Sequence, residues 1–175
     1  MTYRPPYWFL GNYKFDQDEI NIVRDDLIIK NEKHGTSESM CFTSYFTPNK
    51  PESIFLERYR KIIEEIARSA GIFFNTNYDF FYWLQVYDSG MSHKAHNHAV
   101  GIRNDISWVH FLDVPEQKCF RFTDLHDSTF YPDEQNNGDI IYFPSWAWHE
   151  VIGNNSDQIR VAIAGNIKVT EYTKQ

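Results

Sequence analysis

A series of short runs rich in aromatic and β-branched residues begins at Asn75 and constrains the fold more than any other feature of this 175-residue chain. Such side chains favour the pleated, half-buried surface of a sheet. Turn sequences such as Asp88-Ser89-Gly90 and Asn136-Asn137-Gly138 separate the runs. We expect strands over Tyr78–Tyr87, Ile106–Val114, Cys119–Thr123, Asp139–Phe143, His149–Ile152 and Arg160–Val169. Six or more short strands in succession predict an antiparallel jelly roll.

Two helices are predicted before these strands. Asp16 followed by Glu19 resembles a capping box, and apolar residues then recur at helical spacing. A second helix is predicted to begin near Pro51 and to end at Gly71. Its apolar face consists of Phe55, Tyr59, Ile62, Ile63 and Ile66. Packed on one outer face of the strands, both helices would support the sheet.

Two polar segments are candidates for surface loops. Asn31–Lys50 is aperiodic and longer than most ordered connections, and Asp124–Asn137 is a second such loop. Either could be a lid over a substrate or an ordinary surface loop. Taken together, the sequence predicts one domain over residues 1–175. It is a mainly β, double-stranded β-helix (jelly roll or cupin-like), with residues 1–74 as mostly helical support and residues 75–170 as the jelly-roll core.

Composition excludes several classes of function. A formal net charge of −7 argues against binding to the phosphates of nucleic acids. Two cysteines, Cys41 and Cys119, are too few for a disulfide framework and indicate a reducing compartment. No apolar run approaches the ~20 residues of a membrane span, and no signal peptide opens the chain. We therefore expect a cytoplasmic protein that binds neither nucleic acid nor membrane, and its oligomeric state stays open.

Histidines provide the main indication of chemistry. His96 and His98 are separated by one residue, and on a strand such residues face the same side of the sheet. Both imidazoles can therefore reach one metal ion, with His149, at the end of a later strand-turn-strand segment, as third ligand. Three protein ligands leave other coordination positions open, which is a catalytic arrangement. The alternative is that these histidines are ordinary polar residues of a sheet.

Arg160 is the second candidate functional residue. It begins a strand on which Arg160, Ala162 and Ala164 share one face. A guanidinium beside two small side chains fits bidentate binding of a carboxylate. The alternative is a surface salt bridge, which is common for a single arginine.

Three motifs occur in order over about half of the chain. They are Tyr87-x-x-Gly90-x-x-His93-x-x-His96-x-His98, then Gly138…Phe143-Pro144-Ser145-Trp146-x-x-His149-x-Val151, then Arg160-x-Ala162-Ile163-Ala164-x-Asn166. This order resembles the iron(II)/2-oxoglutarate-dependent oxygenases, above all the small bacterial and phage branch related to prolyl hydroxylases. The resemblance implies an Fe(II) site formed by His96, His98 and His149, although His98 stands where most of the superfamily has Asp or Glu.

The resemblance also implies a cosubstrate site and a reaction. Arg160 would pair with the far carboxylate of 2-oxoglutarate, Tyr87 and His110 would help to bind the same molecule, and ascorbate is allowed as a further cofactor. Trp108 stands where Gly is common in this branch and is expected to narrow the cavity. The implied activity is a 2-oxoglutarate-dependent dioxygenase that hydroxylates a C–H bond and releases succinate and carbon dioxide. Its substrate would be a small molecule or a peptide, with prolyl or other amino-acid residues among the options.

Two other functions remain open. Gly90-x5-His96-x-His98 and Gly138-x5-Pro144…His149 also resemble the two cupin motifs. A three-histidine iron site of the thiol-dioxygenase kind would not need 2-oxoglutarate, so loss of Arg160 would only perturb it. The last option is a non-catalytic module with a structural metal site.

Overall fold

The computed structural model describes residues 4–29, 33–36, 39–46, 55–71, 76–99, 105–124, 126, 128–153 and 156–172. The helices in these ranges are α1 (Gln17–Ile29) and α2 (Leu56–Ser69). The strands are β1 (Trp8–Asn12), β2 (Lys33–Thr36), β3 (Ser39–Thr43), β4 (Thr76–Tyr87), β5 (His93–His96), β6 (Ile106–Asp113), β7 (Phe120–Thr123), β8 (Thr129–Phe130), β9 (Asp139–Pro144), β10 (His149–Val151) and β11 (Arg160–Tyr172).

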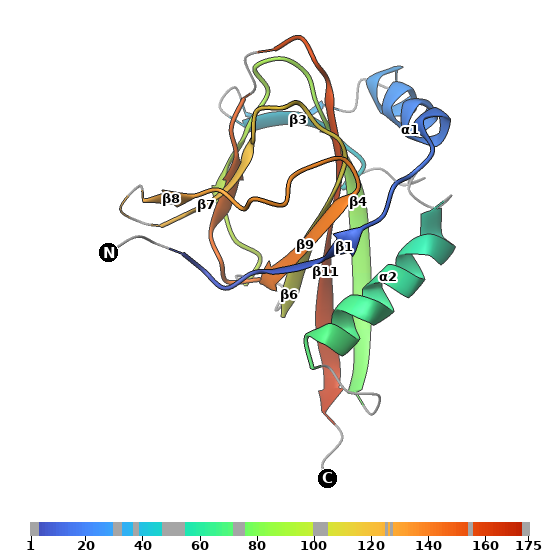
Figure 1. Cartoon of the computed structure of the whole chain (residues 1–175), viewed down its shortest axis with the longest axis vertical. Coiled ribbons are helices and arrows are strands. Elements are labelled where there is room, and N and C mark those ends of the chain that lie inside the picture. The colour runs from blue at the N-terminus through green and yellow to red at the C-terminus, as the bar shows by residue number, and fades with distance from the viewer. Residues whose placement is uncertain are drawn as a thin grey trace.

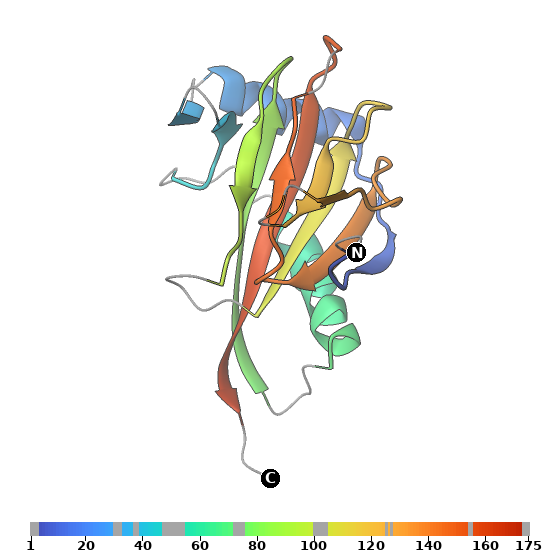
Figure 2. The ribbon, with the colours of Figure 1, turned by 90° about the vertical axis from the view of Figure 1, so that its left-hand side faces the viewer.

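The strands form two sheets. The larger has the order β1-β9-β6-β11-β4-β3-β2, and the smaller has the order β5-β10-β7-β8. All neighbouring strands are antiparallel. Figure 1 shows α1 and α2 on one side of the larger sheet and β7 and β8 on the other, and Figure 2 shows the helices behind that sheet. The predicted mainly β jelly roll with helices on one outer face is confirmed.

Successive side chains of β11 point alternately into two layers of the core. Ala162 and Ala164 belong to an inner cluster that also contains Phe120 and Phe122 of the smaller sheet. Ile163 and its neighbours with the same parity belong to an outer cluster beneath α2. Because β11 pairs with β4 on one side and β6 on the other, it is a central strand of the larger sheet. Residues on its inner face therefore lie between the sheets.

Helix α2 packs as its periodicity predicts. Tyr59, Ile63 and Ile66 are fully buried against the outer face of the larger sheet. The helix is followed by Gly71 at φ 76, a left-handed conformation that favours glycine. The predicted start near Pro51 lies outside the described residues. In α1, Asp16 Oδ1 accepts the Asp18 N–H at 2.8 Å, as expected for an N-cap.

Two expectations about the first 74 residues need correction. Part of Asn31–Lys50, predicted as a loop or lid, forms β2 and β3, and β3 pairs with β4. Strand formation there depends on a distant partner, which local periodicity does not reveal. Together with β1, these strands extend the larger sheet beyond the predicted core of residues 75–170. One domain over residues 1–175 stays a prediction.

The expectation that Trp108 narrows the cavity is wrong. On β6, Val109 and Phe111 face the inner cluster, so Trp108 faces outward. Its ring stacks on Tyr59 of α2 with centroids 5.3 Å apart. Gly165 makes room for it, because a Cβ there would lie 2.5 Å from Trp108 Cζ2.

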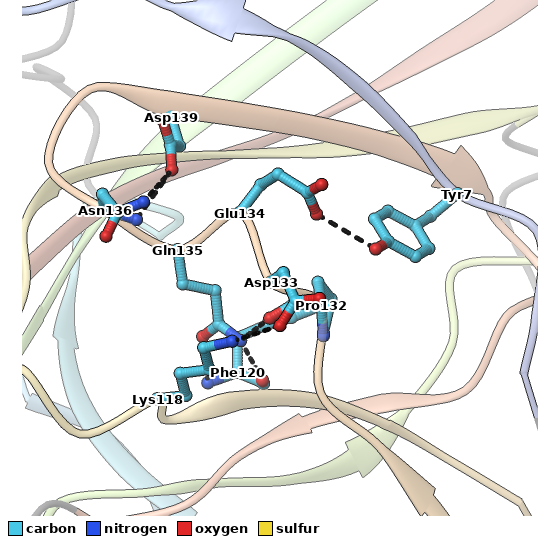
Figure 3. A network of polar contacts seen from close by, with 9 residues as sticks. All are labelled: Tyr7, Lys118, Phe120, Pro132, Asp133, Glu134, Gln135, Asn136 and Asp139. Atoms are coloured by element: carbon cyan, nitrogen blue, oxygen red, sulfur yellow. Dashed lines mark hydrogen bonds and ion pairs between the residues drawn. The ribbon is translucent and has the colours of Figure 1, made fainter.

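The second predicted lid is partly anchored. Figure 3 shows the network that holds residues 132–139. Buried Gln135 exchanges hydrogen bonds with Phe120 of β7, at 3.0 and 2.9 Å, and Lys118 pairs with Asp133 at 2.7 Å. Tyr7 also donates to Glu134 at 3.0 Å. This part of Asp124–Asn137 is therefore an ordered connection and not a free lid. In the described part of the chain, no helix is long and apolar enough to cross a membrane.

Candidate metal centre

Three histidines meet where β5 and β10 pair. His149 lies directly opposite His96 in this ladder. β5 ends at His96, so His98 lies in the bend that follows and not on the strand as expected. Its backbone N–H donates to the Ser145 carbonyl at 2.9 Å, which fixes the bend. The possible ligand nitrogens of the three residues lie within 4.8 Å of one another. Small ring rotations would reduce this to the roughly 3 Å spacing of nitrogens around one ion.

Two of the imidazoles are held in the form that binds metal. His96 Nδ1 contacts the Lys94 carbonyl at 2.8 Å, and His149 Nδ1 contacts the Ala147 carbonyl at 3.0 Å. Because a carbonyl only accepts, Nδ1 carries the proton in both rings and Nε2 keeps its lone pair. Such a backbone contact is the usual outer partner of a metal-binding histidine.

The electrostatics keep the rings neutral. Burial lowers the pKa of His149 well below its ordinary value, and the neighbouring histidines lower it further. Burial, followed by His96, lowers the pKa of His98 to about 4. His93 stacks on His96 at 4.2 Å, and burial lowers its pKa to about 3. Neutral imidazoles need lose no proton to bind a metal. This donor set therefore fits Fe(II), and equally Zn, Ni or Cu.

The inner face of β11 carries a buried cation. Arg160 is 2% exposed and lies opposite Tyr87 of β4. Its guanidinium carbon lies 5.0 Å from the centroid of the Tyr87 ring and 5.9 Å from that of Phe111. None of the ion pairs among the described residues includes Arg160. Although burial lowers its pKa, an arginine stays protonated. A buried charge of this kind calls for an anion.

Two buried donors beside this charge have no acceptor. Arg160 Nη1 and the Tyr87 hydroxyl lack a hydrogen-bond partner within the described ranges. The Cys41 thiol is a polar neighbour of this hydroxyl, and its sulfur is only a weak hydrogen-bond acceptor. Burial raises the pKa of Tyr87 well above its ordinary value, so the hydroxyl keeps its proton. The two groups fit one carboxylate of 2-oxoglutarate, which would accept from both.

His110 does not join this site, and its predicted role in cosubstrate binding is not supported. It shares the outward parity of Trp108 on β6 and lies under α2. Its Nε2 donates to the Tyr13 carbonyl at 2.8 Å, and its Nδ1 therefore accepts from the Tyr59 hydroxyl at 2.7 Å. With both nitrogens satisfied on the helix side of the sheet, His110 has a structural environment.

Comparisons with known proteins agree with this architecture. No family model and no curated protein matches the sequence. The fold, however, is that of the 2-oxoglutarate/Fe(II) oxygenases, and it extends over nearly the whole chain. The resemblance predicted from the motifs is thereby confirmed at the level of the fold.

Three solved structures illustrate the likeness. A prolyl-4-hydroxylase from Pseudomonas putida has a TM-score of 0.63 at 15% identity, covering 94% of this chain and 93% of that one. A 2OG-Fe(II) oxygenase family oxidoreductase from Burkholderia pseudomallei has a TM-score of 0.68 at 12% identity, covering 93% and 84%. The viral collagen prolyl hydroxylase of Paramecium bursaria Chlorella virus 1, solved with 2-oxoglutarate, has a TM-score of 0.61 at 15% identity, covering 94% and 96%.

Proposed function

We propose that the protein is an Fe(II)- and 2-oxoglutarate-dependent dioxygenase that hydroxylates a C–H bond of a small-molecule or peptide substrate. One observation carries the proposal: the three-histidine group and Arg160, whose buried Nη1 has no partner among the described residues, both border the inner cluster between the sheets. A metal site alone fits many functions. The additional anion site is what a cosubstrate with a carboxylate far from the metal requires.

Each residue has a role in this proposal. His96, His98 and His149 would hold Fe(II), and Arg160 with Tyr87 would bind the far carboxylate of 2-oxoglutarate. When bound, iron and 2-oxoglutarate supply the oxidising chemistry, with succinate and carbon dioxide as co-products. The protein orients both groups and excludes water.

The side chains around the two sites fit these roles. Ala162 and Ala164 present only methyl groups on the inner face of β11 between Arg160 and Asn166, the residue that contacts His98, and side chains this small suit a slim ligand. Phe120 and Phe143 pack on the His149 ring with centroids 5.5 and 5.0 Å away. Apolar walls of this kind keep water away and strengthen the attraction between Arg160 and a carboxylate.

The three neutral ligands also fit a dianionic cosubstrate. A carboxylate ligand would remove one positive charge from a divalent ion, whereas three imidazoles leave both. Together with Arg160, the site would then offer three positive charges to a molecule that carries two negative charges. The loaded site would keep one excess positive charge, whereas a carboxylate ligand would leave it neutral, so we infer that His98 strengthens the attraction for the anionic cosubstrate.

The substrate class rests on fold-level likeness. A related structure from Trichoplax adhaerens contains a hypoxia-inducible-factor peptide, and another contains nogalamycin RO together with Fe3+ and alpha ketoglutarate. These support a peptide or a small metabolite as substrate here, and prolyl residues belong in any panel. A role for ascorbate and a cytoplasmic location stay predictions.

Anaerobic titration tests the proposal. Protein loaded with Fe(II) should develop the visible charge-transfer band of an iron–2-oxoglutarate chelate as 2-oxoglutarate is added. With oxygen and a panel of peptides, amino acids and metabolites, succinate should then form in step with hydroxylated product. Metal binding with neither the band nor succinate would exclude this activity.

One observation favours a second candidate. The three-histidine ligand set is also that of a cupin-type dioxygenase that does not use 2-oxoglutarate. In that enzyme, oxygen consumption would be independent of 2-oxoglutarate and only perturbed by Arg160→Met. A metal that binds without any oxygen consumption would instead indicate a non-catalytic module.

A further inference from the structure

A buried chain of polar side chains contacts the third histidine of the metal centre. Asn166, which is 1% exposed, lies in the middle of β11 on its inner face, with its Nδ2 3.4 Å from His98 Nδ1. Ser107 Oγ donates to Asn166 Oδ1 at 2.7 Å and lies 2.9 Å from Ser145 Oγ. Ser107 and Ser145 are 2% and 0% exposed. Because Ser145 also accepts the His98 backbone N–H, the chain forms a closed unit around that residue.

This contact differs from those of the other two ligands. The Nδ1 atoms of His96 and His149 face carbonyl oxygens, which only accept and so fix one tautomer. His98 faces an amide, which can donate or accept. In this structure the amide donates to His98 Nδ1, so the ring proton lies on Nε2. That nitrogen cannot bind a metal until the proton moves.

We propose that Asn166 is a positioning residue that reverses its amide and thereby switches the tautomer of His98 when a metal binds. The inference rests on the metal centre of the proposed function. After a half-turn of the amide, Asn166 Oδ1 accepts from His98 Nδ1–H, Nδ2 donates to Ser107 Oγ, and the Ser107 hydroxyl donates to Ser145 Oγ. The ring proton leaves Nε2 and returns on Nδ1 by exchange with water, so no net proton is gained or lost.

The two serines keep the free-energy cost of reversing the amide low. A hydroxyl both donates and accepts, so Ser107 stays paired with Asn166 in either orientation of the amide. An amide buried among apolar groups would lose a hydrogen bond on turning. Asn166 would also fix the orientation of the His98 ring, as outer partners of metal-binding histidines do.

Metal affinity of the full chain without 2-oxoglutarate tests the inference. Co(II) is titrated in competition with a chelating indicator. Asn166→Asp supplies only acceptors and favours the Nδ1–H tautomer, so its affinity should equal or exceed that of the wild type. Asn166→Leu supplies neither a donor nor an acceptor, and the Co(II) affinity of this variant should fall about 10- to 100-fold. Ser107→Ala keeps the amide but removes its support, and a loss of a few fold is expected.

A second readout follows the tautomer directly. Nitrogen-15 NMR of the histidine rings should show His98 protonated on Nε2 in the metal-free wild type. It should show His98 protonated on Nδ1 in metal-free Asn166→Asp. A residue that only packs would leave the tautomer unchanged in this variant, and the buried carboxylate would weaken Co(II) binding as much as leucine does.

The outcomes separate the two proposals. An Asn166→Leu affinity within twofold of the wild type, or an unchanged tautomer in Asn166→Asp, overturns the role of Asn166. If the leucine variant does not fold, the aspartate and Ser107→Ala variants still decide. Wild-type protein that binds no Co(II) overturns both proposals. Wild-type protein that binds Co(II), shows the expected order of variants and makes no succinate retains the role of Asn166 and loses the dioxygenase.

Discussion

Replacement of Arg160 by Met should largely preserve or raise the stability of the fold while it weakens cosubstrate binding. The guanidinium is 2% exposed, has an unpartnered Nη1 and contacts aromatic rings instead of a carboxylate. Replacing buried charges by apolar residues of similar volume is often neutral or stabilising by about 1–4 kcal/mol. Loss of the cation–π contacts subtracts about 1–2 kcal/mol. The free energy of unfolding should therefore change by between about −1 and +3 kcal/mol, which corresponds to a change in Tm of roughly −3 to +9 °C.

The same substitution should weaken 2-oxoglutarate binding strongly. Truncating one partner of a buried, hydrogen-bonded charge pair costs about 2–5 kcal/mol. At 25 °C this corresponds to an increase in Kd of roughly 30-fold to several thousand-fold. Anaerobic calorimetric titration of Fe(II)-loaded protein measures the affinity, and thermal unfolding of the metal-free protein measures the stability.

Two further variants control for charge and for loss of any arginine. Arg160→Lys keeps the charge without the planar fork, so its affinity should fall between those of wild type and Arg160→Met. Arg121→Met removes a guanidinium on β7 whose side chain is 27% exposed and that is already paired with Glu150 at 2.7 Å. It should leave 2-oxoglutarate affinity unchanged and cost at most about 1 kcal/mol of stability. The reasoning is refuted if Arg160→Met loses 2 kcal/mol or more of stability and binds 2-oxoglutarate normally.

Three other predictions address neighbouring groups. Tyr87→Phe should keep wild-type stability and weaken 2-oxoglutarate about 3- to 10-fold in the same titration, since its hydroxyl lacks another partner; unchanged affinity would remove it from the site. His149→Ala should weaken metal binding by more than about 100-fold, measured by Co(II) competition, and a wild-type value would contradict the centre. Burial lowers the pKa of His110 to about 4, so the unfolded chain binds the extra proton. The contribution of His110 to the free energy of unfolding should be complete above pH 6.5 and should fall by about 3 kcal/mol toward pH 4. His110→Asn should show a weaker acid dependence in urea unfolding, and an unchanged slope would contradict this.

The strands that the sequence predicted are those whose two faces are both buried or nearly so. Predicted Tyr78–Tyr87 corresponds to β4 and predicted Arg160–Val169 to β11, because alternate apolar residues fill the inner and outer clusters. β1, β2, β3, β5 and β8 were not predicted. β3 has only five residues, with no apolar–polar alternation, and is placed by its register with β4, while β5 contains three polar residues out of four, so neither has a strand pattern of its own.

The sequence likewise predicted some features of the site and missed others. The motifs predicted that His96, His98 and His149 belong together, although the ladder that places His149 opposite His96 has no local signature. His110 was assigned from resemblance alone. Strand parity would have corrected it, because Phe111 faces the inner cluster and its neighbour must face away. Asn166 belonged to a quoted motif, yet its contact with His98 depends on the bend after β5.

Strand β11 connects the metal centre with the anion site at Arg160. Arg160 and Asn166 lie six residues apart on its inner face, about 20 Å along an extended strand, and ladders with β4 and β6 hold the strand on both sides. Arg160, at the start of the strand, belongs to the anion site, and Asn166, at its middle, contacts His98 of the metal centre. A central strand cannot slip by one residue without turning every side chain to the opposite face. The register of β11 is thus set by backbone hydrogen bonds on both sides, and under the proposed function it holds the anion-binding guanidinium and the partner of His98 on the same inner face of the sheet.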